Sequence, residues 1–243
     1  MRGKRCAVLA AAITLVSGAA PADAIVGGTP ARVADTPWVV AITTPDGQLF
    51  CGGALVAPDK VMTAAHCASV KGVAGRTPRP AEQMRVVAGR TDLRTTEGVE
   101  AAVTHVWRHP DFKEVTQGDD VAVLTLDRRL PYPTIALGDA GESGVVLGWG
   151  RTSETDRPAM SLRKVTVPIL SDGECAAKEP DYRAGAMLCA GRGGRDACTG
   201  DSGGPLVVKG RLAGVVSYGR GCARPDEPGV YTRLAHYRST VGF

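Results

Sequence analysis

The stretch Gly200-Asp201-Ser202-Gly203-Gly204-Pro205 places one serine between an aspartate and a pair of glycines. A serine hydroxyl is a poor nucleophile unless a base takes its proton and hydrogen-bond donors stabilise the oxyanion. Glycines on both sides let the backbone bend so that successive N–H groups point to one spot. An ordinary glycine-rich turn with an incidental serine is the alternative, but this six-residue string is far more specific. The stretch predicts that Ser202 is a catalytic nucleophile.

A base for this serine is predicted in the stretch Thr63-Ala64-Ala65-His66-Cys67. Its small residues leave room for an imidazole at a cleft, and Cys67 can fix the segment in place. The three other histidines are interpreted as structural or surface residues, namely His105, His109 and His236.

An acid is predicted at the head of the apolar run Val121–Leu126, where Asp119 and Asp120 stand side by side. A carboxylate in this place is either a solvated turn residue or a buried acid that orients a base. Alone, the turn would be the better interpretation. A serine, a histidine and an aspartate together form the set that acyl-transfer enzymes use.

The first 24 residues have the features of a secretory signal. Three basic residues precede the apolar run Ala7–Val16, and Ala22-Asp23-Ala24 has the form of a signal-peptidase site. A membrane anchor or a buried core helix is the alternative, but the run is too short to span a bilayer of about 30 Å. We therefore expect a secreted, extracellular protein with no membrane attachment after signal removal.

The charge and the cysteines of the remaining chain agree with export. Removal of the signal lowers the net charge from +4 to +2, and no basic cluster suggests nucleic acid as a partner. The cysteines lack a CxxC pair and the spacing of a zinc site, so disulfides are the better interpretation. Sequence alone cannot choose among the fifteen pairings that six cysteines allow. These six are Cys51, Cys67, Cys175, Cys189, Cys198 and Cys222.

From Ile25 onward, short apolar stretches alternate with turn residues, which is typical of an all-β protein. The candidate strands are Trp38–Thr43, Gly53–Val56, Met84–Ala88, Val99–Trp107, Val121–Leu126, Val145–Leu147, Leu162–Ile169, Pro205–Val208, Arg211–Ser217 and Gly229–Thr232. The candidate helical segments are one turn at Thr63–Cys67, a short helix at Ser171–Lys178 and a C-terminal helix from Leu234. Gly72–Ala81 is expected to be an exposed loop, and Leu130–Pro133 the crossing between two halves.

Seven motifs in this order resemble the trypsin (chymotrypsin-like) family of serine proteases over essentially all of residues 25–243. They are IVGG (25–28), CGGALV (51–56), TAAHC (63–67), DVAVLTL (120–126), GWG (148–150), GDSGGP (200–205) and PGVYTR (228–233). The order His, Asp, Ser is also that of this family. The resemblance implies two antiparallel six-stranded β-barrels, about residues 25–133 and 134–243, with the active site in the cleft between them and a short C-terminal helix.

The resemblance also implies the chemistry of a secreted serine endopeptidase that acts through an acyl-enzyme, with no cofactor and no metal. Ser202 would be the nucleophile, His66 the base and then the acid, and Asp120 the group that holds the imidazole tautomer. The backbone N–H groups of Gly200 and Ser202 would form the oxyanion hole. Ser217 matches the serine that supports the acid and begins a segment that pairs with substrate. The expected partners of this monomer are polypeptide substrates and protein protease inhibitors.

Specificity is predicted from Asp196, six residues before Ser202. In the family this position lies at the base of the pocket for the residue before the scissile bond, where a carboxylate suits arginine or lysine. Gly219 and Gly229 match the pocket walls and leave room for a long side chain. Ala197 stands where many relatives carry a hydroxyl, so we expect arginine to be preferred over lysine.

By the same resemblance, the cysteines pair as Cys51–Cys67, Cys175–Cys189 and Cys198–Cys222. The amine of Ile25, once free, would form an ion pair with Asp201 and order the pocket. Ile25 follows Ala24 and not a basic residue, which favours direct release of Ile25 by signal peptidase. Cleavage after Ala20 would instead leave Pro21–Ala24 as a propeptide.

One departure from the family and two other readings of the sequence bear on function. Arg90 stands where calcium-binding relatives have a glutamate ligand, so we expect its guanidinium to replace the cation, although Glu97 and Glu100 remain. A catalytically inactive relative that only binds partners would have lost a triad member or a glycine of GDSGGP. An esterase of another fold would carry the order Ser, Asp, His.

Overall fold

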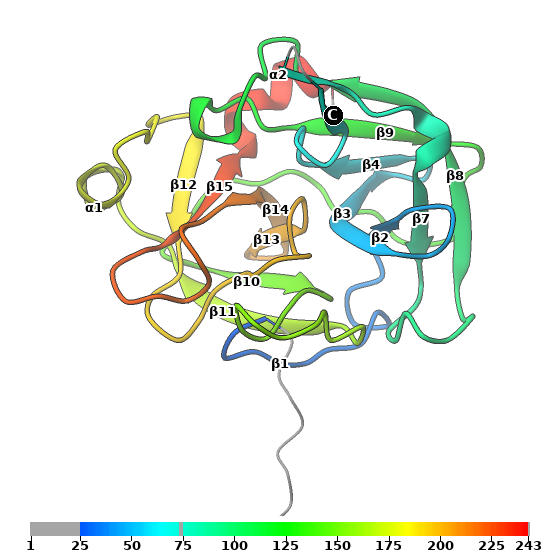
Figure 1. The fold of residues 1–243 in the computed structure, drawn as a ribbon, viewed down its shortest axis with the longest axis horizontal. Helices are drawn as coiled ribbons and strands as arrows, with labels where there is room; N and C mark the ends of the chain where they lie inside the picture. Colours follow the sequence, from blue (N-terminus) through cyan, green and yellow to red (C-terminus); the bar gives the residue numbers. More distant parts are fainter. Residues whose placement is uncertain (1–24, 73–74, 243) are drawn as a thin grey trace, which may run out of the picture.

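The computed structural model describes residues 25–72 and 75–242, so the predicted signal at residues 1–24 lies outside the described residues. Antiparallel strands make up two units that lie side by side, and the helices are few and short (Figure 1). The expected all-β class is confirmed.

The first unit is a closed barrel of six strands in the order β2-β3-β4-β9-β8-β7. The strands are β2 (Val39–Thr43), β3 (Leu49–Ala57), β4 (Lys60–Thr63), β7 (Arg85–Ala88), β8 (Val99–Arg108) and β9 (Ala122–Leu126). Register shifts interrupt the β2–β3, β3–β4 and β8–β9 ladders. Such irregularities bend a strand, which lets a short sheet close on itself around apolar side chains such as Ile42, Leu55 and Leu124.

The second unit is a sheet of seven strands in the order β1-β11-β10-β13-β14-β15-β12. The strands are β1 (Thr29–Pro30), β10 (Ser143–Gly148), β11 (Arg163–Pro168), β12 (Met187–Ala190), β13 (Pro205–Val208), β14 (Arg211–Tyr218) and β15 (Gly229–Arg233). An isolated bridge between Ile169 and Ala190 joins the end of β11 to β12. The six strands from β11 to β12 in this order thus form a sheet that closes at a single bridge, and β1 is paired only with β11. In the first barrel, by contrast, full ladders join all neighbouring strands.

The remaining elements are small. They are the hairpin β5 (Ser69–Gly72) and β6 (Gly75–Pro78), the 3₁₀ turns η1 (Ala81–Gln83), η2 (Val115–Gln117) and η3 (Leu234–Tyr237), and the helices α1 (Asp172–Lys178) and α2 (Arg238–Val241). Helix α1 begins where expected because Ser171 and Glu174 form a reciprocal capping box. The hairpin corrects the expected loop at Gly72–Ala81. Its strands are mostly polar and Val70 is the one apolar aliphatic residue in them, so they carry no apolar alternation that a sequence pattern could detect.

Both chain ends cross to the other unit. Strand β1 pairs with β11 of the second sheet, and η3 packs Leu234 and Tyr237 against Val121 and Val123 of the first barrel. The two units therefore share one apolar interface and are tied together by the chain at both ends. Among the described residues, no helix has the length and the apolar content that crossing a membrane requires.

Candidate active site

Ser202 lies on a tight loop that the backbone holds on both sides. Asp201 N–H donates to the Cys198 carbonyl at 2.9 Å, and the Ser202 carbonyl accepts the Gly52 N–H of the first barrel at 2.7 Å. Gly203 has a φ of +74°, and a Cβ on it would lie 2.7 Å from the Gly52 carbonyl oxygen. Only glycine satisfies both constraints, which explains why this position in the stretch has no side chain.

His66 follows β4 and Asp120 precedes β9, and these two strands are neighbours in the first barrel. In the β4–β9 ladder Thr63 pairs with Ala122, so the residues after Thr63 and before Ala122 meet at the same edge of the barrel. Asp120 Oδ1 accepts the backbone N–H of His66 at 2.8 Å, and Asp120 Oδ2 lies 2.8 Å from His66 Nδ1. The structure thus brings Asp120, and not its neighbour Asp119, to the imidazole.

The second unit contributes two further bonds to Asp120. Ser217 Oγ on β14 donates to Asp120 Oδ2 at 2.5 Å, and Thr232 Oγ1 on β15 donates to the Asp120 carbonyl at 2.7 Å. Burial would raise the pKa of this carboxyl, but the His66 charge and the hydrogen bonds from His66 and Ser217 lower it below the ordinary value. Asp120 is therefore an ionised acid in a nearly dry site.

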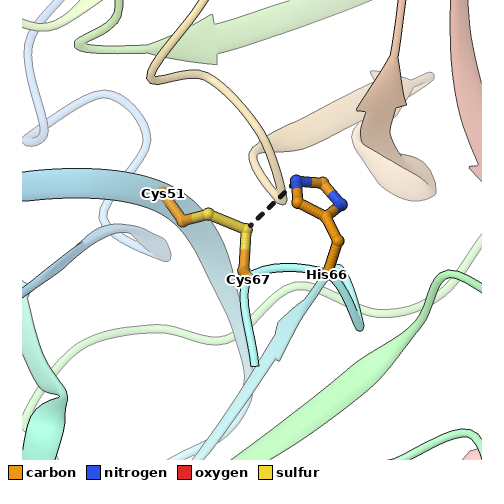
Figure 2. A group of neighbouring side chains, drawn as sticks. All are labelled: Cys51, His66 and Cys67. Carbon is orange, nitrogen blue, oxygen red and sulfur yellow. Dashed lines mark hydrogen bonds between the residues drawn. A yellow bond between two sulfur atoms is a disulfide. The ribbon is translucent and has the colours of Figure 1, made fainter. Parts of the chain in front are cut away.

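The structure does not join His66 to Ser202. Among the described residues no hydrogen bond links Ser202 Oγ to the imidazole, and His66 Nε2 lies 3.6 Å from Cys67 Sγ (Figure 2). Catalytic hydrogen bonds are often long in a free enzyme and shorten when substrate binds. The side chain of His66 is 17% exposed, so the imidazole is partly accessible to solvent.

Figure 2 also shows why the group Cys51, His66 and Cys67 does not suit a metal. The possible ligand atoms lie within 4.8 Å of one another, but the two sulfurs form a disulfide. Metals bind cysteine as the thiolate, so this sulfur pair is not a ligand set. The described disulfides also include Cys175–Cys189 and Cys198–Cys222, and all three expected pairings are present.

Two backbone donors beside Ser202 are free. Within the described residues, the N–H groups of Gly200 and Ser202 donate to no protein acceptor, whereas those of Asp201 and Gly203 are bonded to carbonyl oxygens. Free N–H groups on alternate residues of a tight loop can bind a developing negative charge.

A cavity of about 310 Å³ opens beside Ser202 and contains a buried carboxylate. Asp196 is 3% exposed and accepts the N–H groups of Ala197 at 2.8 Å and Ala223 at 3.2 Å. No cation pairs with it among the described residues, and burial raises its pKa to about 7. The lining includes all the predicted pocket residues, namely Asp196, Ala197, Ser217, Gly219 and Gly229.

The cavity has room for a long side chain because Gly229 has none. A Cβ at this position would lie 2.6 Å from Asp196 Oδ1. Sequence reasoning missed Glu154, which lines the cavity and binds the Arg224 guanidinium at 2.6 and 2.9 Å and the Cys222 N–H at 3.1 Å. No motif marks Glu154, because its hydrogen-bond partners lie on a loop that is distant in sequence and that only the fold brings close.

Asp201 is a second buried carboxylate without a cation. It is fully buried and accepts the N–H groups of Gly150 at 2.8 Å and Cys198 at 3.0 Å, and burial raises its pKa to about 7. The Ile25 N–H is also buried and donates to the Arg151 carbonyl at 3.1 Å, not to Asp201. The predicted ion pair is absent here because Ile25 is still joined to the preceding residue and has no charged amine.

The loop that binds calcium in some relatives is bridged by a side chain. Arg90 Nε donates to the Glu97 carbonyl at 2.6 Å, so the guanidinium lies on a loop carbonyl. That this arginine takes the place of a cation stays a prediction.

Comparison with known proteins identifies a single family. The family model described as Trypsin matches residues 25–241. A trypsin of Saccharopolyspora erythraea is 47% identical over 88% of this chain and 94% of its own length. A trypsin of Squalus acanthias is 36% identical over 90% and 95%, and a vitellin-degrading protease of Bombyx mori is 39% identical over 89% and 84%.

The buried Asp201 predicts how stability depends on pH in the chain before cleavage. Its pKa is about 7 in the folded chain and about 3.9 in an unfolded one. Because the folded state binds the proton more tightly, this contribution to stability is complete below pH 4 and is lost as the pH rises through 7. The free energy of unfolding of the uncut Ser202→Ala chain should therefore fall between pH 4 and 8, as measured by urea denaturation.

Asp201→Asn should reduce the fall in that same measurement, because the amide does not ionise. Asp139→Asn is the matched control, since the side chain of Asp139 is 75% exposed and its removal tests the loss of one surface charge. A stability curve with the same slope in the Asp201→Asn chain as in the parent would contradict the assignment.

Proposed function

The chain belongs to the trypsin family and is a serine endopeptidase, and we propose that it is secreted and cuts polypeptides after arginine, and less readily after lysine. The observation that carries the specificity is the buried, unpaired carboxylate of Asp196 in a cavity that opens at Ser202. A guanidinium that enters the cavity can form two hydrogen bonds to this carboxylate and neutralise its charge.

In the proposed mechanism, Ser202 Oγ attacks the carbonyl carbon of the scissile bond while His66 Nε2 takes the hydroxyl proton. The C–N bond then breaks as His66 returns that proton to the leaving amine. Water then attacks the acyl-enzyme ester while His66 takes its proton, and the ester C–O bond breaks as His66 returns that proton to Ser202 Oγ. Asp120, bonded to His66 Nδ1 at 2.8 Å, keeps the proton on Nδ1 and stabilises the imidazolium.

The free N–H groups of Gly200 and Ser202 are proposed to hold the oxyanion of each tetrahedral intermediate. One such donor contributes about 3 kcal/mol to the stabilisation of the transition state. The segment Ser217–Gly219 lines the same cavity, and its backbone is proposed to pair with the substrate as an added strand.

Arginine is proposed as the preferred residue because Ala197 supplies no side-chain acceptor beside Asp196. A guanidinium has two donors in one plane and reaches the carboxylate directly. An ammonium is shorter and would need the extra acceptor that a serine at 197 would supply.

Activation is proposed to follow directly from export. In the described chain Ile25 has a φ of +59°, an unfavourable conformation for a β-branched residue. Cleavage between Ala24 and Ile25 removes that constraint and creates an amine that can pair with the buried Asp201. Three disulfides agree with an oxidising compartment.

The proposed specificity is tested by sequencing the peptides that the mature protein produces from a denatured proteome. Arginine should precede most new termini, and matched ester substrates should show a kcat/KM about tenfold higher for arginine than for lysine, the effect of one hydrogen bond of about 1.4 kcal/mol. Ala197→Ser should narrow this ratio. Ser202→Ala, as the matched control, should give no new termini. Equal rates for the two esters would reject the role given to Ala197.

The proposed activation is tested by N-terminal sequencing of freshly secreted Ser202→Ala protein, in which self-processing is blocked. A first residue of Ile25 supports direct release by signal peptidase. A first residue of Pro21 would show that a separate activating protease is needed.

A further inference from the structure

A partly buried contact next to the catalytic acid lies outside the triad and the cavity. Asp119, which precedes Asp120, has a φ of +58°. This left-handed conformation is uncommon for a residue with a side chain, although aspartate tolerates it better than most. Something in the surrounding structure must therefore hold Asp119 in place.

Tyr237 of η3 holds it by two hydrogen bonds. Its hydroxyl accepts the Asp119 N–H at 3.1 Å and donates to Asp119 Oδ1 at 3.1 Å. One hydroxyl can do both, because it carries one proton and two lone pairs. Burial raises the pKa of Tyr237, so the hydroxyl keeps the proton that it donates.

The ring of Tyr237 is itself fixed. The residue is 1% exposed and packs edge-to-face against His109, with 5.3 Å between ring centroids, and against His236 at 4.8 Å. His109 Nδ1 in turn lies 3.8 Å from Asp119 Oδ1. The hydroxyl therefore has a defined position from which to set the backbone of Asp119.

The conformation of Asp119 passes directly to Asp120. Val121 N–H donates to the Asp119 carbonyl at 2.9 Å, which places Asp120 at the centre of a three-residue turn. A rotation at Asp119 would thus move the Asp120 carboxylate, which must meet His66 N and Nδ1 at 2.8 Å.

We propose that Tyr237 is a positioning residue for the catalytic acid: by holding Asp119 in its left-handed conformation, it directs the Asp120 carboxylate to His66. This inference rests on the proposed triad. It assigns to the C-terminal η3 segment a part in catalysis, in addition to its packing on the first barrel.

The test compares Tyr237→Phe with the wild-type enzyme on an arginine ester. The substitution keeps the ring and removes the hydroxyl, so kcat should fall about tenfold while KM stays within twofold, since Tyr237 does not touch the cavity. Tyr182→Phe is the matched control, because Tyr182 also donates to a carboxylate, that of Asp172, but near α1. It should keep kcat within twofold.

A pH profile separates positioning from a loss of stability. A displaced Asp120 stabilises the imidazolium less, so the acid limb of kcat/KM should move to lower pH in Tyr237→Phe. The titratable groups near Tyr237 are His109, His236, Asp119 and Asp120, and all of them remain in the variant. A fall in kcat with an unmoved acid limb would overturn the proposal, as would an unchanged kcat.

Asp119 variants provide a second test. Asp119→Asn keeps an oxygen acceptor and tolerates a positive φ, so it should retain kcat within about threefold, whereas Asp119→Ala should lose about tenfold. Adding Tyr237→Phe to Asp119→Ala should cost less than the sum of the two single losses, because both variants remove the hydrogen bond to Asp119 Oδ1 and only Tyr237→Phe also removes the bond from the backbone N–H. Fully additive losses would contradict the proposal.

The downfield proton resonance of His66 Nδ1–H gives a readout that needs no activity. In Ser202→Ala protein it should be sharp, and Tyr237→Phe in that background should broaden or shift it, while Tyr182→Phe should not. An unchanged resonance overturns the proposal for Tyr237. Failure of the triad itself would appear separately, as full activity of the Ser202→Ala enzyme.

Discussion

Hydrogen bonds to the buried residue Asp120 connect the two units of the molecule. From the first barrel, the backbone N–H and the imidazole of His66 bind its carboxylate. From the second unit, the Ser217 hydroxyl donates to the carboxylate and the Thr232 hydroxyl donates to the backbone carbonyl. These bonds extend from 2.5 to 2.8 Å, so little relative movement of the two units is compatible with all of them. The apolar interface and the crossed chain ends keep the units in this relation.

Asp120 has a charged partner, which distinguishes it from the two other buried carboxylates of the site. Asp120 has a partner, and its pKa is lowered, whereas burial raises the pKa of Asp196 and of Asp201 to about 7. An unpaired buried carboxylate is costly for a fold and is often found where a cation binds. On the proposed function, Asp196 receives the substrate's guanidinium and Asp201 the new amine of Ile25. In both sites, a buried carboxylate would then be neutralised by a cation that arrives after folding.

The sequence predicts the parts of the site that short motifs encode. Glycine, alanine and cysteine flank Ser202, His66 and the cavity residues in patterns that few other structures need. These patterns carry the resemblance to the trypsin family, and the disulfide pairing followed from that resemblance. The choice of Asp120 over Asp119 also depended on the resemblance to the family, in which the acid directly precedes the strand. In the structure Asp120 is hydrogen-bonded to His66, whereas Asp119 is hydrogen-bonded to Tyr237.

The remaining features depend on contacts between distant segments. Glu154 and Tyr237 lie in no motif, because their partners are more than 60 residues away in sequence. The strands of the β5–β6 hairpin are mostly polar and contain a single valine, so their sequence pattern resembles that of a loop. The single bridge that closes the second sheet joins Ile169 to Ala190, and no periodicity marks either residue. Such features follow from the packed fold and not from local pattern.

The central claim is that Asp120 acts by orienting His66, and Asp120→Asn tests it most directly. The amide keeps the shape of the carboxylate but can donate to Nδ1, which favours the tautomer with its proton on Nε2, and that nitrogen then cannot accept the Ser202 proton. The measurement is kcat on an arginine ester at neutral pH, with the fold verified by circular dichroism. We predict a fall of about 10⁴-fold. A folded variant whose kcat lies within tenfold of the wild-type value would contradict the account.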